Sequence, residues 1–251
     1  MEISLSAESL FHIGSFPITN TLVMTFLLST LIIITSLVLR NKLKLIPRGF
    51  QNVFEYIVEA ILDLVDSVTQ NREQTKKFFP IVTTIFIFII LSNWIEIIPG
   101  LGTIGINEIN KHGETVLVPF IRSTSADLNV TLAIALISVF TIQFMGIAAI
   151  GAAKYAGKFF VNPFHKPYFI GTFVGGLELI SEIAKIISFS FRLFGNIFAG
   201  EVLLIVMLNL VPYFVPLPFL FLELFVGFIQ ALVFAMLTLV FLKMAVTEVA
   251  H

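Results

Sequence analysis

Three apolar segments, each about as long as a membrane-spanning helix, occupy most of the first 150 residues of this chain. They cover residues 18–39, 78–98 and 128–150, and the last follows Asp127, a residue type that caps helices. A helix rises about 1.5 Å per residue, so about 20 apolar residues cross the hydrocarbon layer of a bilayer. Only 12% of the residues are charged, roughly half the share in soluble domains, so we expect an integral membrane protein.

Two longer apolar tracts, residues 168–210 and 218–246, fill the last third of the chain. As one helix, the first would be about 65 Å long, roughly twice the hydrocarbon thickness, so it must tilt, follow the interface or break. Pro212, Pro216 and Pro218 mark the turn between the tracts. We therefore predict an all-α membrane protein, a single membrane domain over residues 1–251. About five transmembrane helices are expected, the last two forming a long tilted hairpin.

A segment with a different pattern, residues 50–67, joins the first two spans. Its apolar residues recur at helical spacing, and polar residues such as Gln51, Glu55 and Glu59 fall between them. This pattern predicts an amphipathic helix. Two interpretations stay open: the helix lies on the cytoplasmic surface of the membrane, or it is a connector packed against the other helices.

The basic residues predict the orientation in the membrane. Most of the 15 lysines and arginines fall near residues 40–48, 72–77 and 154–166, which lie on one side if five spans alternate in direction. Basic loops favour the cytoplasmic side. We therefore expect a multi-pass protein with its N-terminus outside the cell and its C-terminus in the cytoplasm.

The last two tracts also carry ionisable residues, which the middles of the first three spans lack. The polar residues of these tracts are Glu178, Glu182, Lys185, Arg192, Asn196, Glu201, Glu223 and Gln230. Arg192 is the most informative, since a guanidinium cannot shed its proton and costs about 2.5–3.5 kcal/mol at the centre of a membrane helix. Such groups usually mark an ion path, so this set is the candidate site.

Helical spacing divides these residues into two groups. The first five are separated by 4, 3, 7 and 4 residues, which places them on one stripe of a helix. Glu201 is nine residues past Arg192, about half a turn out of phase, and should face away from that stripe. Glu223 and Gln230 share a face of the final helix. We predict one path along the Arg192 stripe and a second around Glu201 and Glu223.

Simpler roles remain open for some of these side chains. Glu182 and Lys185 have the i,i+3 spacing of an ion pair that only tethers helices. Lys185 can also extend its ammonium group to the cytoplasmic interface. Gln230 can serve as an interhelical hydrogen-bond donor.

Other kinds of site find no support in the sequence. There is no cysteine, and the four histidines are scattered, so neither a metal site nor thiol chemistry is expected. Residues 151–159 resemble a phosphate loop only superficially, because the spacing is wrong and Phe159 stands where Ser or Thr would bind magnesium. A net charge of −1 gives no indication of a nucleic-acid partner. We expect no cofactor and no catalytic residue.

Taken together, the motifs resemble the bacterial subunit a of F-type ATP synthases. The strongest match is Phe-Arg-Leu-Phe-Gly-Asn at 191–196, followed by Ala-Gly-Glu at 199–201. Supporting matches are Ser-Ala-Asp-Leu-Asn-Val-Thr at 125–131, Asn-Pro at 162–163 and Gln-Ala at 230–231. Two positions depart from the usual pattern: Glu223 stands where some members have His, and Ile186 where Pro is frequent.

The resemblance implies a non-catalytic stator subunit in the bacterial inner membrane. Its expected partners are a rotating ring of c subunits, the b-subunit peripheral stalk, other ATP synthase subunits, membrane lipid and protons. Two offset half-channels would carry protons to and from the c-ring carboxylates, with Arg192 facing the ring. By the same resemblance, Glu201 and Glu223 belong to the outer half-channel and Glu178 to the cytoplasmic side. Asn196 and Gln230 would lie near the arginine.

Two other functions stay open at this point. A secondary transporter or ion channel could use Arg192 as an anion site, and it would transport without further subunits. A purely structural membrane scaffold would tolerate loss of the arginine charge.

Overall fold

Long apolar helices dominate the computed structural model, which describes residues 7–14, 16–44, 49–98, 104–109, 115–120, 122–157 and 170–247. The expected Asn-Pro pair at 162–163 and the expected helix start at 168 lie outside these residues. Within these described ranges, five helices are long and apolar enough to cross a membrane, which confirms the predicted fold class. They are α1 (Asn20–Lys42), α3 (Arg72–Glu96), α4 (Leu128–Ile150), α6 (Ile170–Leu210) and α7 (Pro216–Val246).

Local capping explains where several helices begin. The Asn71 side chain accepts hydrogen bonds from the backbone N–H groups of Glu73 and Gln74, so α3 begins six residues before the expected apolar segment. Asp127 caps α4 as predicted, accepting from the backbone N–H of Asn129. Helix α7 begins at Pro216, because a proline in the first turn removes no intrahelical hydrogen bond.

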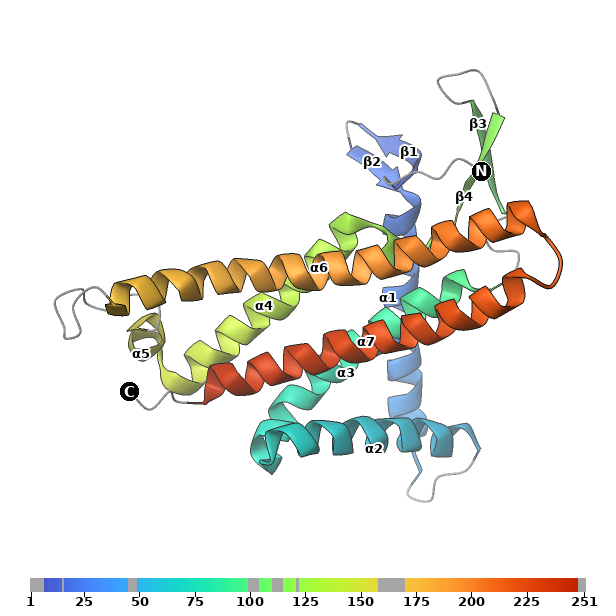
Figure 1. The fold of residues 1–251 in the computed structure, drawn as a ribbon. Coiled ribbons are helices and arrows are strands. Elements are labelled where there is room, and N and C mark those ends of the chain that lie inside the picture. Colours follow the sequence, from blue (N-terminus) through green and yellow to red (C-terminus); the bar gives the residue numbers. More distant parts are fainter. Residues whose placement is uncertain are drawn as a thin grey trace.

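The last two long helices form an antiparallel hairpin that crosses α1 steeply (Figure 1). The connection is short, residues 211–215, and Phe214 within it adopts a positive φ of 62°. Helix α6 packs against both α4 and α7, which also contact each other. The hairpin therefore forms one wall of the molecule, and the side chains on its packed face differ sharply from those on its open face.

The amphipathic helix α2 (Phe50–Thr69) combines features of both interpretations of its sequence. Its C-terminal end packs into the bundle, where Val65 is fully buried and the Val68 carbonyl accepts a hydrogen bond from Lys243 Nζ at 2.6 Å. Residues 52–60 are exposed, including the apolar Val53 and Tyr56. Figure 1 shows α2 lying across the end of α1 that is remote from the strands.

Two short antiparallel β-hairpins were not predicted from the sequence. One pairs β1 (Ser9–Ile13) with β2 (Phe16–Thr19), and the other pairs β3 (Gly105–Ile109) with β4 (Thr115–Pro119). The Asn20 side chain donates to the Pro119 carbonyl at 3.3 Å and so links the second hairpin to the start of α1. Both hairpins lie beyond the same end of α1 (Figure 1).

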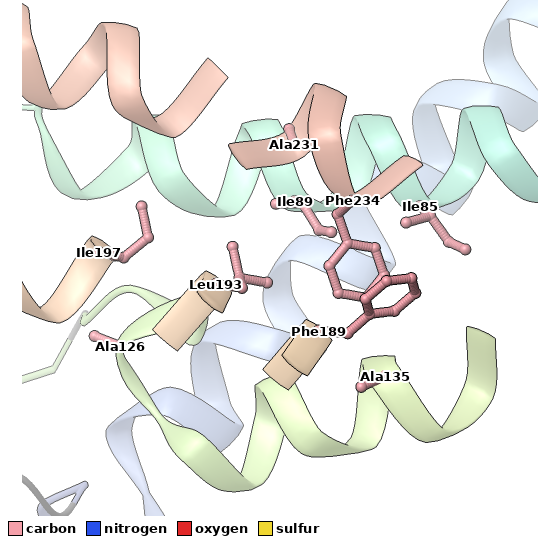
Figure 2. Close-up of a cluster of buried hydrophobic side chains, with 9 residues drawn as sticks. All are labelled: Ile85, Ile89, Ala126, Ala135, Phe189, Leu193, Ile197, Ala231 and Phe234. Atoms are coloured by element: carbon pink, nitrogen blue, oxygen red, sulfur yellow. The ribbon is translucent and has the colours of Figure 1, made fainter. Parts of the chain in front are cut away.

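A buried apolar cluster between α3, α4, α6 and α7 holds the hairpin in place. Figure 2 shows its members, which are Ile85, Ile89, Ala126, Ala135, Phe189, Leu193, Ile197, Ala231 and Phe234. The rings of Phe189 and Phe234 join α6 to α7, with their centroids 4.8 Å apart. The α6 members recur every four residues, so one face of α6 is fixed against the bundle.

Candidate functional site

Arg192 lies on the face of α6 that points away from this apolar cluster. Its neighbours Phe189 and Leu193 are buried, whereas Arg192 and Asn196 are exposed. The guanidinium Nη2 donates to Ser188 Oγ at 3.0 Å, one turn earlier on the same helix. Among the described residues no carboxylate lies within ion-pair distance of it.

Glu201 lies further along α6 and forms an ion pair with Arg122. Arg122 Nε and Nη2 donate to the two carboxylate oxygens of Glu201 at 3.1 and 3.0 Å. The side chains are only 7% and 18% exposed, respectively. Such a two-point contact fixes the direction of both groups, because the planar guanidinium matches the carboxylate. Glu201 is thereby held away from the open face that carries Arg192.

Glu223 reaches the same region from α7. Its side chain is 6% exposed, and its Oε2 is buried without a hydrogen-bond partner. A Cβ at Gly200 would lie 3.1 Å from Oε1 of Glu223, so the glycine beside Glu201 lets the second carboxyl approach α6. We refer to Arg122, Glu201 and Glu223 as the outer cluster; it contains two carboxyl groups and one guanidinium.

Side-chain to backbone hydrogen bonds hold α3 against α7 next to the outer cluster. Asn93 Nδ2 donates to the Gly227 carbonyl at 3.0 Å, and Trp94 Nε1 donates to the Leu224 carbonyl at 3.1 Å. Gly227 is one turn from Glu223, and a Cβ there would lie 3.0 Å from Cβ of Asn93. The close approach of the two helices fixes the depth at which Glu223 is buried.

The 3₁₀ turn η2 (Thr124–Ala126) anchors the backbone that follows Arg122. Ser92 on α3 hydrogen-bonds to the hydroxyls of Thr124 and Ser125, and its carbonyl accepts from Ser123 Oγ at 3.4 Å. All four side chains are fully buried. The backbone next to Arg122 is therefore held in place, although Arg122 lies in a segment that connects two helices.

A second polar group lies toward the other end of α6. Lys185 Nζ donates to Glu182 Oε1 at 2.7 Å, which confirms the i,i+3 ion pair. The same ammonium group lies 4.7 Å from the centroid of the Phe241 ring on α7. Glu182 Oε2 is buried without a hydrogen-bond partner, and Glu178 is half-buried one turn earlier.

Tyr155 on the short helix α5 (Ala152–Gly157) joins this second group. Its hydroxyl donates to Gln143 Oε1 on α4 at 2.6 Å. Burial, followed by the negative charges of Glu182 and Glu178, raises the pKa of Tyr155 to about 12. We refer to Tyr155, Glu178, Glu182 and Lys185 as the inner group.

The structure therefore separates the residues that the sequence analysis selected. Arg192 and Asn196 occupy the open face of α6, while the carboxylates of the outer cluster point into the bundle. Gln230 is half-buried on α7. Sequence reasoning missed Arg122 and Tyr155. The available signal for Arg122 was the presence of two carboxylates in apolar tracts without a nearby cation. The position of Tyr155 after the third span gave no such signal.

Comparison with known proteins identifies the family. A family model described as ATP synthase A chain matches residues 21–243. ATP synthase subunit a of Helicobacter pylori (strain Shi470) is 37% identical over 227 residues, which are 90% of this chain and 89% of that protein. The chain belongs to the ATP synthase subunit a family.

Two further members of the subunit a family match at similar levels. The protein of Campylobacter concisus (strain 13826) is 34% identical over 90% of this chain and 88% of its own length. That of Campylobacter jejuni (serotype O:23/36, strain 81-176) is 32% identical over 100% of this chain and 96% of its own length. The family match runs from the start of α1 nearly to the end of α7, so it includes the open face of α6 and the outer cluster.

Proposed function

We propose that this chain is the stator subunit of an F-type ATP synthase and carries protons to and from a ring of c subunits. It acts as one non-catalytic, multi-pass unit in the bacterial inner membrane, with the N-terminus outside and the C-terminus in the cytoplasm. The c ring and the b-subunit peripheral stalk are its partners in the complex. Membership in the subunit a family and the basic segments around residues 40–48 and 72–77 support this assignment.

Arg192 is the residue that meets the ring in this proposal. Its exposure on the open face of α6, without a carboxylate partner in the described chain, is the observation that carries the assignment. A ring carboxyl arriving beside a fixed positive charge is favoured in its ionised form and releases its proton. Once rotation carries the carboxyl into lipid, only the protonated form is tolerated, so it must first bind a proton again.

The two polar groups are the proposed proton routes to the two sides of the membrane. The outer cluster supplies carboxyl groups on the side of the β-hairpins, and the inner group supplies Glu178, Glu182 and Lys185 at the other end of α6. Arg192 lies between them along α6, and Asn196 follows one turn later on the same face. A fixed cation there repels protons and prevents direct leakage. Each proton that crosses 100 mV through the ring delivers about 2.3 kcal/mol.

A charge-removal variant tests this function directly. In the intact complex in inverted membrane vesicles, Arg192→Ala is expected to abolish ATP-driven proton pumping while the complex still assembles. The matched control is Arg72→Ala, which removes an arginine that is 60% exposed and paired with Asp66. The complex with this control variant should pump normally. Normal coupled pumping by the Arg192 variant would refute the proposal. So would ion flux through vesicles that contain only this chain.

A further inference from the structure

We infer that Arg122 is a positioning residue that holds both carboxylate oxygens of Glu201, leaving Glu223 as the carboxyl that exchanges protons on the outer route. This inference rests on the proposed function, since it assigns separate roles to the two carboxyl groups of the outer cluster.

The contact between Arg122 and Glu201 uses both carboxylate oxygens. Two nearly parallel N–H···O bonds of 3.1 and 3.0 Å occupy the whole carboxylate edge. A charge-assisted pair of this kind is strong, and opening it leaves an uncompensated charge in a largely dry position. Protonating Glu201 would break one of the two bonds. Glu201 is therefore a poor proton carrier while Arg122 is in place.

Glu223 differs from Glu201 in each of these respects. The nearby guanidinium is already engaged by Glu201, and Oε2 of Glu223 has no hydrogen-bond partner although it is buried. A buried carboxylate without a counter-ion is costly, whereas the neutral carboxyl is tolerated. The unpartnered oxygen is therefore the atom on which a proton can arrive and leave without dismantling the ion pair.

The residues around Glu223 also differ from those around Glu201. Gly200 precedes Glu201 in the chain, and its missing Cβ leaves room for the Glu223 carboxyl beside α6. On α3, Asn93 donates its side-chain N–H to the carbonyl of Gly227, which is one turn from Glu223. The Oδ1 atom of Asn93 is a buried acceptor without a partner.

A set of five variants in the intact complex tests this assignment. Arg122→Gln leaves Glu201 charged and unpaired, and we expect at least a 10-fold loss of ATP-driven proton pumping. Arg122→Gln combined with Glu201→Gln replaces the ion pair with two neutral groups and should recover most of the lost pumping. Arg122→Lys keeps the charge without the two-point contact and should fall between wild type and Arg122→Gln. Glu223→Gln should abolish pumping, and Arg122→Gln should not restore it.

An infrared difference spectrum of the complex separates this role from a merely structural one. Beside the signals of the ring carboxyls, one carboxyl band that changes with protonation should disappear in Glu223→Gln and persist in Glu201→Gln. If the double variant pumps no better than Arg122→Gln, or neither assembles, Arg122 acts through contacts other than Glu201 and the inference is overturned. Loss of the signal in Glu201→Gln alone would also overturn it. These outcomes leave the Arg192 test unaffected, so the two proposals fail separately.

Discussion

Replacement of Gly146 by alanine should loosen the junction between α4 and α5. A Cβ at this position would lie 2.4 Å from Cε2 of Tyr155 and 3.1 Å from the backbone oxygen of Ala245. The tyrosine cannot swing into solvent at low cost, because it is only 6% exposed and its hydroxyl is bonded to Gln143 at 2.6 Å. The added methyl group must therefore displace the ring.

The size of the effect follows from the overlap. Carbon atoms in contact lie about 3.5–4.0 Å apart, so the ring must retreat by roughly 1 Å or more. Overpacking of this kind costs about 1–3 kcal/mol, and a lost hydrogen bond adds about 1 kcal/mol. The better helix propensity of alanine offsets at most about 1 kcal/mol of this destabilisation. We expect a net destabilisation of about 1–3 kcal/mol for Gly146→Ala.

Thermal unfolding of the purified complex in detergent measures this effect. Gly176→Ala on α6 is the matched control, since its Cβ would meet no atom within 4 Å, and its midpoint should not fall. In a Tyr155→Ala background the methyl group has space, so Gly146→Ala should cost at least about 1 kcal/mol less than in wild type. Equal costs in the two backgrounds, or an unchanged midpoint for the single variant, would refute the packing argument.

Three further predictions concern the helix contacts and the inner group. Asn93→Ala should lower stability by about 1–2 kcal/mol, because the buried Gly227 carbonyl loses its donor, and the thermal midpoint of the complex reports the change. Lys185→Ala should slow pumping more than Lys185→Ala with Glu182→Gln, because only the single variant leaves a half-buried carboxylate unpaired; equal rates would contradict this. The pKa of Tyr155 is raised from 10.0 to about 12, so the folded state holds that proton more tightly than the unfolded chain. The resulting stability is complete below pH 10 and is lost as the pH rises toward 12. Tyr155→Phe should remove that part of the alkaline destabilisation and one tyrosinate absorbance step at the upper end of the titration.

The membrane helices could be predicted because each depends on local sequence. An apolar run of sufficient length must span the membrane or be buried in the protein, and the predicted cap Asp127 directly precedes the helix that it caps. The final helix begins at Pro216, two residues before the expected start, because a proline is tolerated in the first turn. The ion pair of Glu182 with Lys185 was predictable for the same reason. The amphipathic pattern of residues 50–67 also predicted a helix, but not which part of it would pack against the bundle.

The outer cluster depends on contacts that no local pattern encodes. Arg122 and Glu201 are 79 residues apart, and the pair forms only because η2 is anchored to Ser92 of α3. The depth of Glu223 likewise depends on a glycine of another helix, Gly200. Helical phase did indicate that Glu201 turns away from Arg192, but it could not identify the group that Glu201 would meet. The short β-hairpins were missed because their strands have only four or five residues.

Disulfide crosslinking to the c ring tests most directly whether the open face of α6 meets the rotor. The chain contains no cysteine, so a single cysteine introduced on α6 reports on its own position. Asn196→Cys, on the exposed face one turn from Arg192, should crosslink under oxidation to a cysteine beside the ring carboxylate. Ile197→Cys, the next residue but only 2% exposed, should not. Crosslinking at 197 with none at 196 would contradict the orientation of α6 on which the account depends.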